Sequence, residues 1–194
     1  IVNCCGFDSI PSDLGVKFLQ QHSKRHFGNY CQKIKLRVKA LKGGASGGTI
    51  ASGLNLYKEA SGDPEIRREM RDPYSLCPPG HSFTTRQHNV SVEFDEDFES
   101  WAAPFIMASI NTRVVLRSNA LIDGYYAENF EYDEAMLTGP NKQGKRTAKR
   151  ISLGTQISMY AMSLAPLRWL ATRFFLPKPG EGPSPEQQLN GFYD

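Results

Sequence analysis

The chain has 194 residues, of which 40% are apolar and 22% charged, with 17 glycines and 12 prolines. This length predicts one domain, or one large domain with a fragment of another, and the composition excludes collagen-like, fibrous and wholly disordered chains. The net charge of +3 is too small to indicate a nucleic-acid-binding protein by itself. Because the first residue, Ile1, stands inside an apolar run, we expect a piece of a longer protein.

The first residues predict a strand, a tight turn and the start of a helix. Residues 1–5 are apolar enough to end a buried strand, and Gly6 to Ser9 then turn the chain. Asp8 or Ser9 can cap the following helix, and Pro11 suits its first turn. Since α/β proteins often place ligands at such a corner, two interpretations of Asp8 and Ser9 stay open, capping alone and a ligand site.

A charged strand and a glycine-rich loop follow. Residues 33–41 alternate between apolar and basic side chains, which predicts a strand with one solvated face. The loop 43–49 then leads into a predicted helix over 50–60, and its backbone N–H groups could hold a phosphate, a carboxylate or a carbonyl oxygen. Because the loop lacks both GxGxxG and the lysine of a P-loop, a plain strand-to-helix turn is an equal alternative.

The middle of the chain predicts two helices and a strand between them. A helix-start signature predicts a short helix over 63–71, and the alternation in 90–94 predicts a strand. The segment 104–121 has apolar residues at helical spacing on most sides, yet it also carries Asn111 and Arg113. We expect this helix to be buried, with its polar groups directed at partners within the fold or at a ligand.

The last third predicts a strand over 129–136 and a long apolar segment over 151–176, which follows the basic stretch 141–150. Pro166 and Arg168 interrupt this segment, which argues against a transmembrane span. Two interpretations remain: a core helix, or a helix that lies on a lipid surface while the basic stretch meets anionic headgroups.

Charges and cysteines add two further expectations. No acidic residue occurs in 14–58 or 135–180, and an acidic cluster lies at 93–99. Solvated faces or a surface for anionic ligands would explain this grouping. The four cysteines have no CxxC spacing, which argues against a zinc or thioredoxin-like site and suits a reducing compartment.

Four blocks of sequence, spread over nearly the whole chain, carry a resemblance to a known family. They are residues 5–15 (CGFDSIPSDLG), 46–52 (SGGTIAS), 110–115 (INTRVV) with 117–121 (RSNAL), and 180–186 (GEGPSPE). In this order they resemble the saccharopine dehydrogenase-like oxidoreductases, specifically the trans-acting enoyl reductase branch. The resemblance implies an N-terminal Rossmann domain for NAD(P), followed by an α+β substrate domain built on a mixed sheet.

The glycine-rich fingerprint of that family is missing here, together with most of the Rossmann domain, and the last strands beyond Asp194 are expected to be missing too. The expected fold class is therefore α/β to α+β. Residues 1–22 would form the C-terminal end of a Rossmann-like unit. Residues 23–194 would form a mixed β-sheet substrate domain with packed helices, truncated at its C-terminus.

The resemblance also implies site residues. Gly6, Phe7 and Asp8 would face the nicotinamide pocket as cofactor-binding residues. The candidates for the substrate cleft are Ser46, Gly47, Gly48, Thr49, Asn111 and Arg113. No catalytic residue and no metal ligand is nominated.

The leading hypothesis is the substrate-domain portion of an NAD(P)-dependent oxidoreductase that reduces an enoyl or carbonyl group of a lipid-linked substrate. The 194-residue chain alone is expected to be inactive. The alternative is a non-catalytic protein that keeps this fold and associates with a lipid or membrane surface, and a weaker one is an isolated anion-binding module.

The partners expected are a lipid-like small molecule and, over 142–176, a membrane or lipid surface. Nucleic acid is not expected, and homo-oligomerisation stays open. The expected location is intracellular, either cytoplasmic or peripheral on a membrane or lipid droplet.

Overall fold

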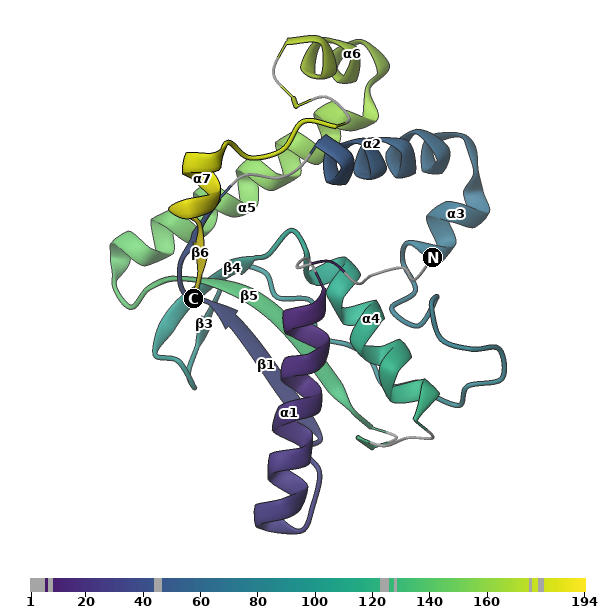
Figure 1. Cartoon of the computed structure of the whole chain (residues 1–194), viewed down its shortest axis with the longest axis vertical. Coiled ribbons are helices and arrows are strands. Elements are labelled where there is room, and N and C mark those ends of the chain that lie inside the picture. The colour runs from purple at the N-terminus through teal and green to yellow at the C-terminus, as the bar shows by residue number, and fades with distance from the viewer. Residues whose placement is uncertain are drawn as a thin grey trace.

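The computed structural model of the chain describes residues 6, 9–43, 47–122, 126–127, 129–174, 176–177 and 180–194. The helices in this part are α1 (Ile10–Phe27), α2 (Gly47–Gly62), α3 (Pro64–Glu69), α4 (Ala108–Leu121), α5 (Lys142–Ser163), α6 (Ala165–Phe174) and α7 (Pro185–Leu189). The strands are β1 (Lys33–Val38), β2 (Leu41–Lys42), β3 (Glu93–Asp95), β4 (Ser100–Pro104), β5 (Glu131–Gly139) and β6 (Phe192–Tyr193). Figure 1 shows their arrangement.

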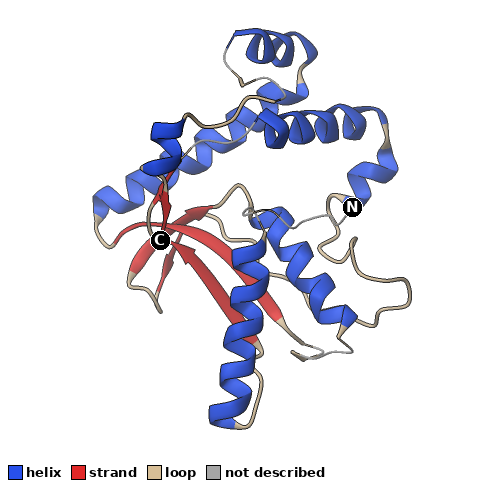
Figure 2. Cartoon of the chain, viewed as in Figure 1, coloured by secondary structure: helices blue, strands red, loops and turns tan. Residues whose placement is uncertain are grey.

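A mixed sheet of four strands forms the centre of the molecule, in the order β1-β5-β4-β3 (Figure 2). β1 runs parallel to β5, whereas β4 is antiparallel to both of its neighbours. The short strands β2 and β6 pair separately and bring the end of the chain back beside β1. The predicted mixed sheet with packed helices is confirmed, while a Rossmann-like unit at 1–22 stays a prediction.

The core lies between one face of this sheet and the helices α1 and α4. Ile34 of β1 and Tyr132 of β5 are partners in the parallel register, so they point to the same face. There they join the core cluster with Val16 of α1 and with Val115 and Leu116 of α4. Burial of these apolar side chains holds the two helices against the sheet.

The helix predictions in the first two thirds agree well with the structure. α3 begins after Asp63, whose carboxylate accepts a hydrogen bond from the backbone N–H of Glu65 at 2.7 Å. The predicted strand 90–94 is shorter and shifted to β3, and β4 was not predicted. The segment 104–121 begins as the end of β4, and its helix starts only at Ala108.

The long segment 151–176 is not a core helix in the described part of the chain. α5 and α6 divide it, with the break at Leu164, and α6 has no buried residue. Tyr160, Trp169 and Phe174 are 69%, 63% and 65% exposed. None of the helices among the described residues has the length and apolar character needed to cross a bilayer.

α5 starts in direct contact with the end of β5. Gly144 is buried, and a Cβ atom there would lie 2.7 Å from the carbonyl carbon of Gly139 and 2.9 Å from the carbonyl oxygen of Thr138. The hydroxyl of Thr138 donates to the carbonyl oxygen of Gly144 at 3.0 Å, which keeps the two segments together. Only glycine therefore fits at position 144.

Gly144→Ala is expected to lower the free energy of unfolding by about 1–3 kcal/mol, because the added methyl group must displace backbone atoms. Gly154→Ala is the matched control, because a Cβ atom at this position of the same helix meets nothing within 4 Å. That variant should be neutral or stabilising by up to about 1 kcal/mol, since alanine favours helix. Urea unfolding measures both, and equal effects would contradict the close packing at Gly144.

Candidate functional site

A cavity of about 740 Å³ lies beside the N-terminal half of α4. Its walls come from α4, from the end of β4, and from the two loop segments 70–74 and 84–90, which connect α3 to β3. Both apolar and polar side chains face it, among them Tyr74, Phe105, Ser109, Thr112, Arg113 and Glu134. The volume falls in the range of about 300–1,000 Å³ that is typical of small-molecule sites.

A buried carboxylate forms part of the cavity wall. Glu134 lies in the middle of β5 and is only 2% exposed. One of its carboxylate oxygens accepts a hydrogen bond from the hydroxyl of Tyr132 at 2.5 Å, and the other accepts from the side-chain amide of Asn111 at 2.9 Å. These two donors compensate for the water that the carboxylate loses on burial.

Ser9 extends this hydrogen-bonded chain to the start of α1. Its hydroxyl donates to the side-chain oxygen of Asn111 at 3.0 Å, which fixes the amide with its NH₂ group toward Glu134. Ser9 occupies the N-cap position of α1 but makes no side-chain capping bond. Of the two residues expected as the cap, Ser9 does not serve, because its hydroxyl is turned toward α4. Asp8 lies outside the described residues.

Gln87 holds the loop 84–90 over the sheet edge. Its side-chain amide donates to the carbonyl oxygen of Phe130 at 3.0 Å and accepts from the backbone N–H of Tyr132 at 3.0 Å. The Gln87 side chain thus takes the place of a neighbouring strand along the first part of β5, which β4 does not reach. The amide also donates to the hydroxyl of Tyr74 at 2.8 Å, and burial raises the pKa of that phenol, so it stays protonated.

Arg113 lines the cavity and also fixes its rim. The guanidinium donates to the carbonyl oxygen of Met70 at 2.6 Å and to the hydroxyl of Ser75 at 3.3 Å. Burial lowers the pKa of Arg113, and the nearby charge of Asp72 opposes this effect. Contact of Arg113 with substrate stays a prediction. The same holds for Asn111, which is buried and hydrogen-bonded to Ser9 and Glu134.

The other predicted substrate residues lie elsewhere. Gly47, Gly48 and Thr49 form the first turn of α2, which packs mainly on α3 and α5, whereas α4 packs mainly on α1 and β5. The backbone N–H of Gly47 donates to the carbonyl oxygen of Glu181 at 2.8 Å, so it is already used within the fold. Ser46 lies outside the described residues. The structure does not bring this turn to the cavity.

The predicted cofactor residues are described only in part, since Phe7 and Asp8 lie outside the described residues. The carbonyl oxygen of Gly6 accepts hydrogen bonds from the backbone N–H groups of Ser9 and Ile10 at 3.3 and 3.1 Å. A dinucleotide pyrophosphate needs N–H donors at a glycine-rich turn after a parallel strand. Gly6 is the one predicted cofactor residue that is described, and its carbonyl oxygen is an acceptor, so binding of NAD(P) at this turn stays a prediction.

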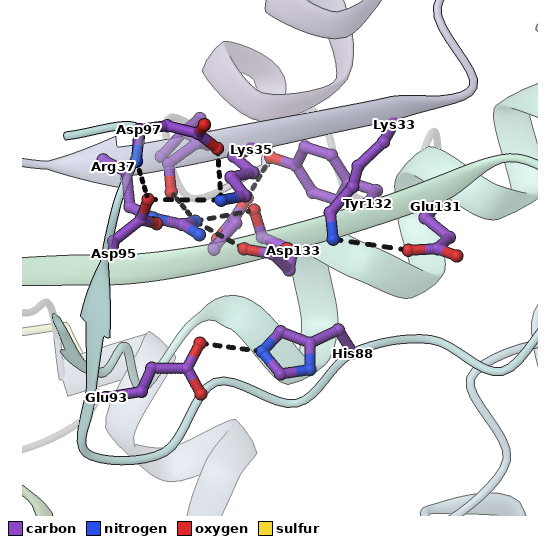
Figure 3. Close-up of polar contacts among 12 residues, drawn as sticks. Lys33, Lys35, Arg37, His88, Glu93, Asp95, Asp97, Glu131, Tyr132 and Asp133 are labelled. Carbon is purple, nitrogen blue, oxygen red and sulfur yellow. Dashed lines mark hydrogen bonds and ion pairs between the residues drawn. The ribbon is translucent and has the colours of Figure 1, made fainter.

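A second buried polar cluster lies on the opposite face of the sheet (Figure 3). The side chains of Arg37 and Asp133 are 1% and 2% exposed, and the guanidinium pairs with the carboxylates of Asp95 and Asp133 at 2.7 and 2.5 Å. Lys35 pairs with Asp95 and Asp97. The prediction that β1 has a solvated charged face therefore holds only at its start, where Lys33 is exposed. Further along the strand, β3, the turn after it and β5 supply partners that cover Lys35 and Arg37.

Glu134, Tyr132 and Gln87 were not predicted from the sequence as site residues. The alternation along β5 does contain a signal for Glu134, because a residue two positions after a core-facing Tyr132 points to the same face. A glutamate on the core side of a strand needs a partner or a function. Gln87 has no such signal, since it lies in a loop.

The fold and the cavity define a mixed α/β domain that can hold a small molecule beside a buried carboxylate. A provisionally named trans-acting enoyl reductase of Mycobacterium tuberculosis is 36% identical to the chain, over 100% of the chain and 48% of the relative. Trans-acting enoyl reductases of Mycobacterium ulcerans and Mycobacterium bovis are 31% and 32% identical, again over the whole chain and 49% of each relative. By these relationships the chain is a homologue of the trans-acting enoyl reductases, matched over its own whole length.

The chain spans about half the length of the curated relatives it matches. No protein-family model and no solved structure matches it.

Proposed function

We propose that the protein acts as an NAD(P)-dependent enoyl reductase on a lipid-linked substrate, and that this chain supplies its substrate-binding cavity. The names of the relatives support reduction of an enoyl group. The single observation that carries the proposal is the carboxyl group of Glu134, buried at 2% exposure in the wall of a cavity of about 740 Å³.

Reduction of a double bond conjugated to a thioester carbonyl adds a hydride to the β carbon and a proton to the α carbon. A reduced nicotinamide supplies the hydride when it is bound. Within this chain, Glu134 is the group at the cavity wall that passes the proton to the α carbon. After the proton has left, the carboxylate keeps the two donors that it already has, Tyr132 and Asn111, which stabilise the negative charge.

The remaining walls suit the substrate. Tyr74 and Phe105 offer apolar surface to the carbon chain, while Ser109, Thr112 and Arg113 offer polar groups near the carbonyl end. The dinucleotide is proposed to bind to a part of the whole protein that the relatives have and that lies outside the aligned half.

The test uses the full-length protein with NADPH or NADH and an enoyl thioester. We expect enoyl-dependent loss of the reduced-nicotinamide absorbance, and in deuterated water we expect one deuterium at the α carbon of the saturated product. Oxidation of the cofactor by a ketone or aldehyde substrate, but by no enoyl thioester, would assign a carbonyl reductase instead. No oxidation with either class would contradict the proposal.

A further inference from the structure

We propose that α6 and the second half of α5 dock on a bilayer that contains anionic lipid. The surface concerned, called the α5–α6 surface below, consists of Leu153, Ile157, Tyr160, Leu167, Trp169 and Phe174. In Figure 1, α6 and the end of α5 lie at the end of the molecule away from α1. This inference goes beyond the proposed reductase activity and does not depend on it.

The first observation is the exposure of large apolar side chains that a folded protein normally buries. Leu153 and Ile157 are each 59% exposed, and Trp169 and Phe174 are more exposed still. The rings of Trp169 and Phe174 contact each other edge to face, with centroids 6.4 Å apart, and the guanidinium of Arg173 lies 5.9 Å from the Phe174 centroid. The two rings are thus in contact on α6, and exposed apolar side chains of this size are a mark of an interaction surface.

The second observation is charge. Residues 142–174 include seven basic residues and no acidic one: Lys142, Lys145, Arg146, Lys149, Arg150, Arg168 and Arg173. On α5, Lys149 is followed by Leu153, Ile157 and Tyr160 at spacings of four, four and three, so one face changes from basic to apolar along the helix. An apolar end beside a basic half matches the depth profile of a bilayer, in which anionic headgroups lie above the acyl chains.

The same charge argues for a bilayer over a second copy of the chain. Two α5–α6 surfaces in contact would bring like charges together without an acidic partner from this segment, among them Arg168 and Arg173 of both copies. Trp169 and Tyr160 are residue types that favour the membrane interface. Since no described helix can cross a bilayer, the helices would lie on its surface.

A groove between α2 and α6 adds apolar area to the same region. It has a volume of about 530 Å³, and Ile50, Leu54, Trp169 and Leu176 are among the residues that line it. Lys58 and Arg168 also border the groove. The apolar area with cations at its border thus continues from α6 onto α2.

The experiment is sedimentation of the full-length protein with vesicles of phosphatidylcholine alone or of an equal mixture with phosphatidylserine. We expect binding to the mixed vesicles only, and we expect salt at about 1 M to release the protein because it screens charges beyond about 3 Å. Trp169→Ser with Phe174→Ser, and separately Lys149→Glu with Arg150→Glu, should each weaken binding at least tenfold.

Two matched controls separate the α5–α6 surface from general effects. Phe27→Ser removes an aromatic ring that is 75% exposed at the end of α1, and Arg25→Glu with Lys42→Glu makes the same charge change elsewhere. Both controls should bind like the parent protein. Absence of binding to mixed vesicles, or equal losses in the controls, would overturn the proposal. So would a stable dimer in light scattering that the Trp169 and Phe174 substitutions dissociate, since a second copy would then cover the surface.

Discussion

Replacing Glu134 with glutamine is expected to lower the kcat of enoyl reduction by about 100-fold or more. Glutamine keeps the size of the side chain but cannot release a proton to the α carbon. The cavity walls stay in place, so the KM for the enoyl thioester should change much less than kcat. Steady-state kinetics of the full-length protein, with the folded state checked by circular dichroism, measure both values.

Glu93→Gln is the matched control for this prediction. Glu93 is a nearby carboxylate that is partly exposed and pairs with His88 at 2.8 Å, outside the hydrogen-bonded chain of Glu134. It should leave kcat unchanged. Tyr132→Phe removes one of the two donors to Glu134 and should give an intermediate loss. If Glu134→Gln retains the parent kcat, the proton must come from another group and the assignment of Glu134 is wrong.

Arg37→Met is expected to lower the free energy of unfolding by about 3–5 kcal/mol, the largest stability effect that we predict. The variant removes the guanidinium that pairs with Asp95 and Asp133, and it leaves these carboxylates buried. Adding Asp133→Leu to Arg37→Met should recover part of the loss, because one uncompensated charge then disappears. Urea unfolding of the parent and the two variants measures these differences.

Lys33→Met is the control on the same strand. Lys33 pairs with Glu131 at 3.5 Å, and both side chains are substantially exposed, so its removal should cost less than about 1 kcal/mol. If Lys33→Met and Arg37→Met lower the free energy of unfolding by similar amounts, the buried cluster does not stabilise the fold more than an exposed ion pair does.

The buried cluster also predicts how stability depends on pH. Burial tends to raise the pKa of Asp95, but hydrogen bonds from Arg37 and Lys35 outweigh it and hold the pKa below its usual value. The unfolded chain, with a carboxyl pKa of about 3.9, therefore takes up a proton before the folded chain does. Asp95 therefore contributes fully to the free energy of unfolding at a pH above the unfolded-state pKa. This contribution is lost as the pH falls through the lower pKa of the folded state. In Arg37→Met this acid-dependent loss should be smaller.

Local signals in the sequence determined much of the secondary structure. Pro11 in the first turn of α1, Asp63 before Pro64 at the start of α3, and the apolar spacing of 108–121 each act within a few residues, so their effects can be inferred from neighbours alone. The strand β5 was predicted from its aromatic residues for the same reason. β4 was missed because the segment Ser100–Pro104 is short and shows no clear alternation.

Residue roles that depend on distant partners were not predictable in this way. The alternation of β1 correctly indicated a strand, yet it could not show that Asp95 and Asp133 cover its charged face. Serine is a residue type that often caps helices, but the hydroxyl of Ser9 contacts Asn111, 102 positions away in the sequence. The candidate residues Gly47, Gly48 and Thr49 were expected in a loop, but they already belong to the first turn of α2, which does not line the cavity.

The sequence by itself determined the helix that carries Asn111 and Arg113, and its resemblance to the trans-acting enoyl reductases implied the mixed sheet. Only the tertiary structure decided that Asn111 orients Glu134, that Arg113 anchors the cavity rim, and that the apolar segment after residue 151 stays exposed. The physical reason is range. Capping, turn chemistry and periodicity act over a few residues, whereas the burial and hydrogen bonding of a polar group depend on which remote segments pack against it.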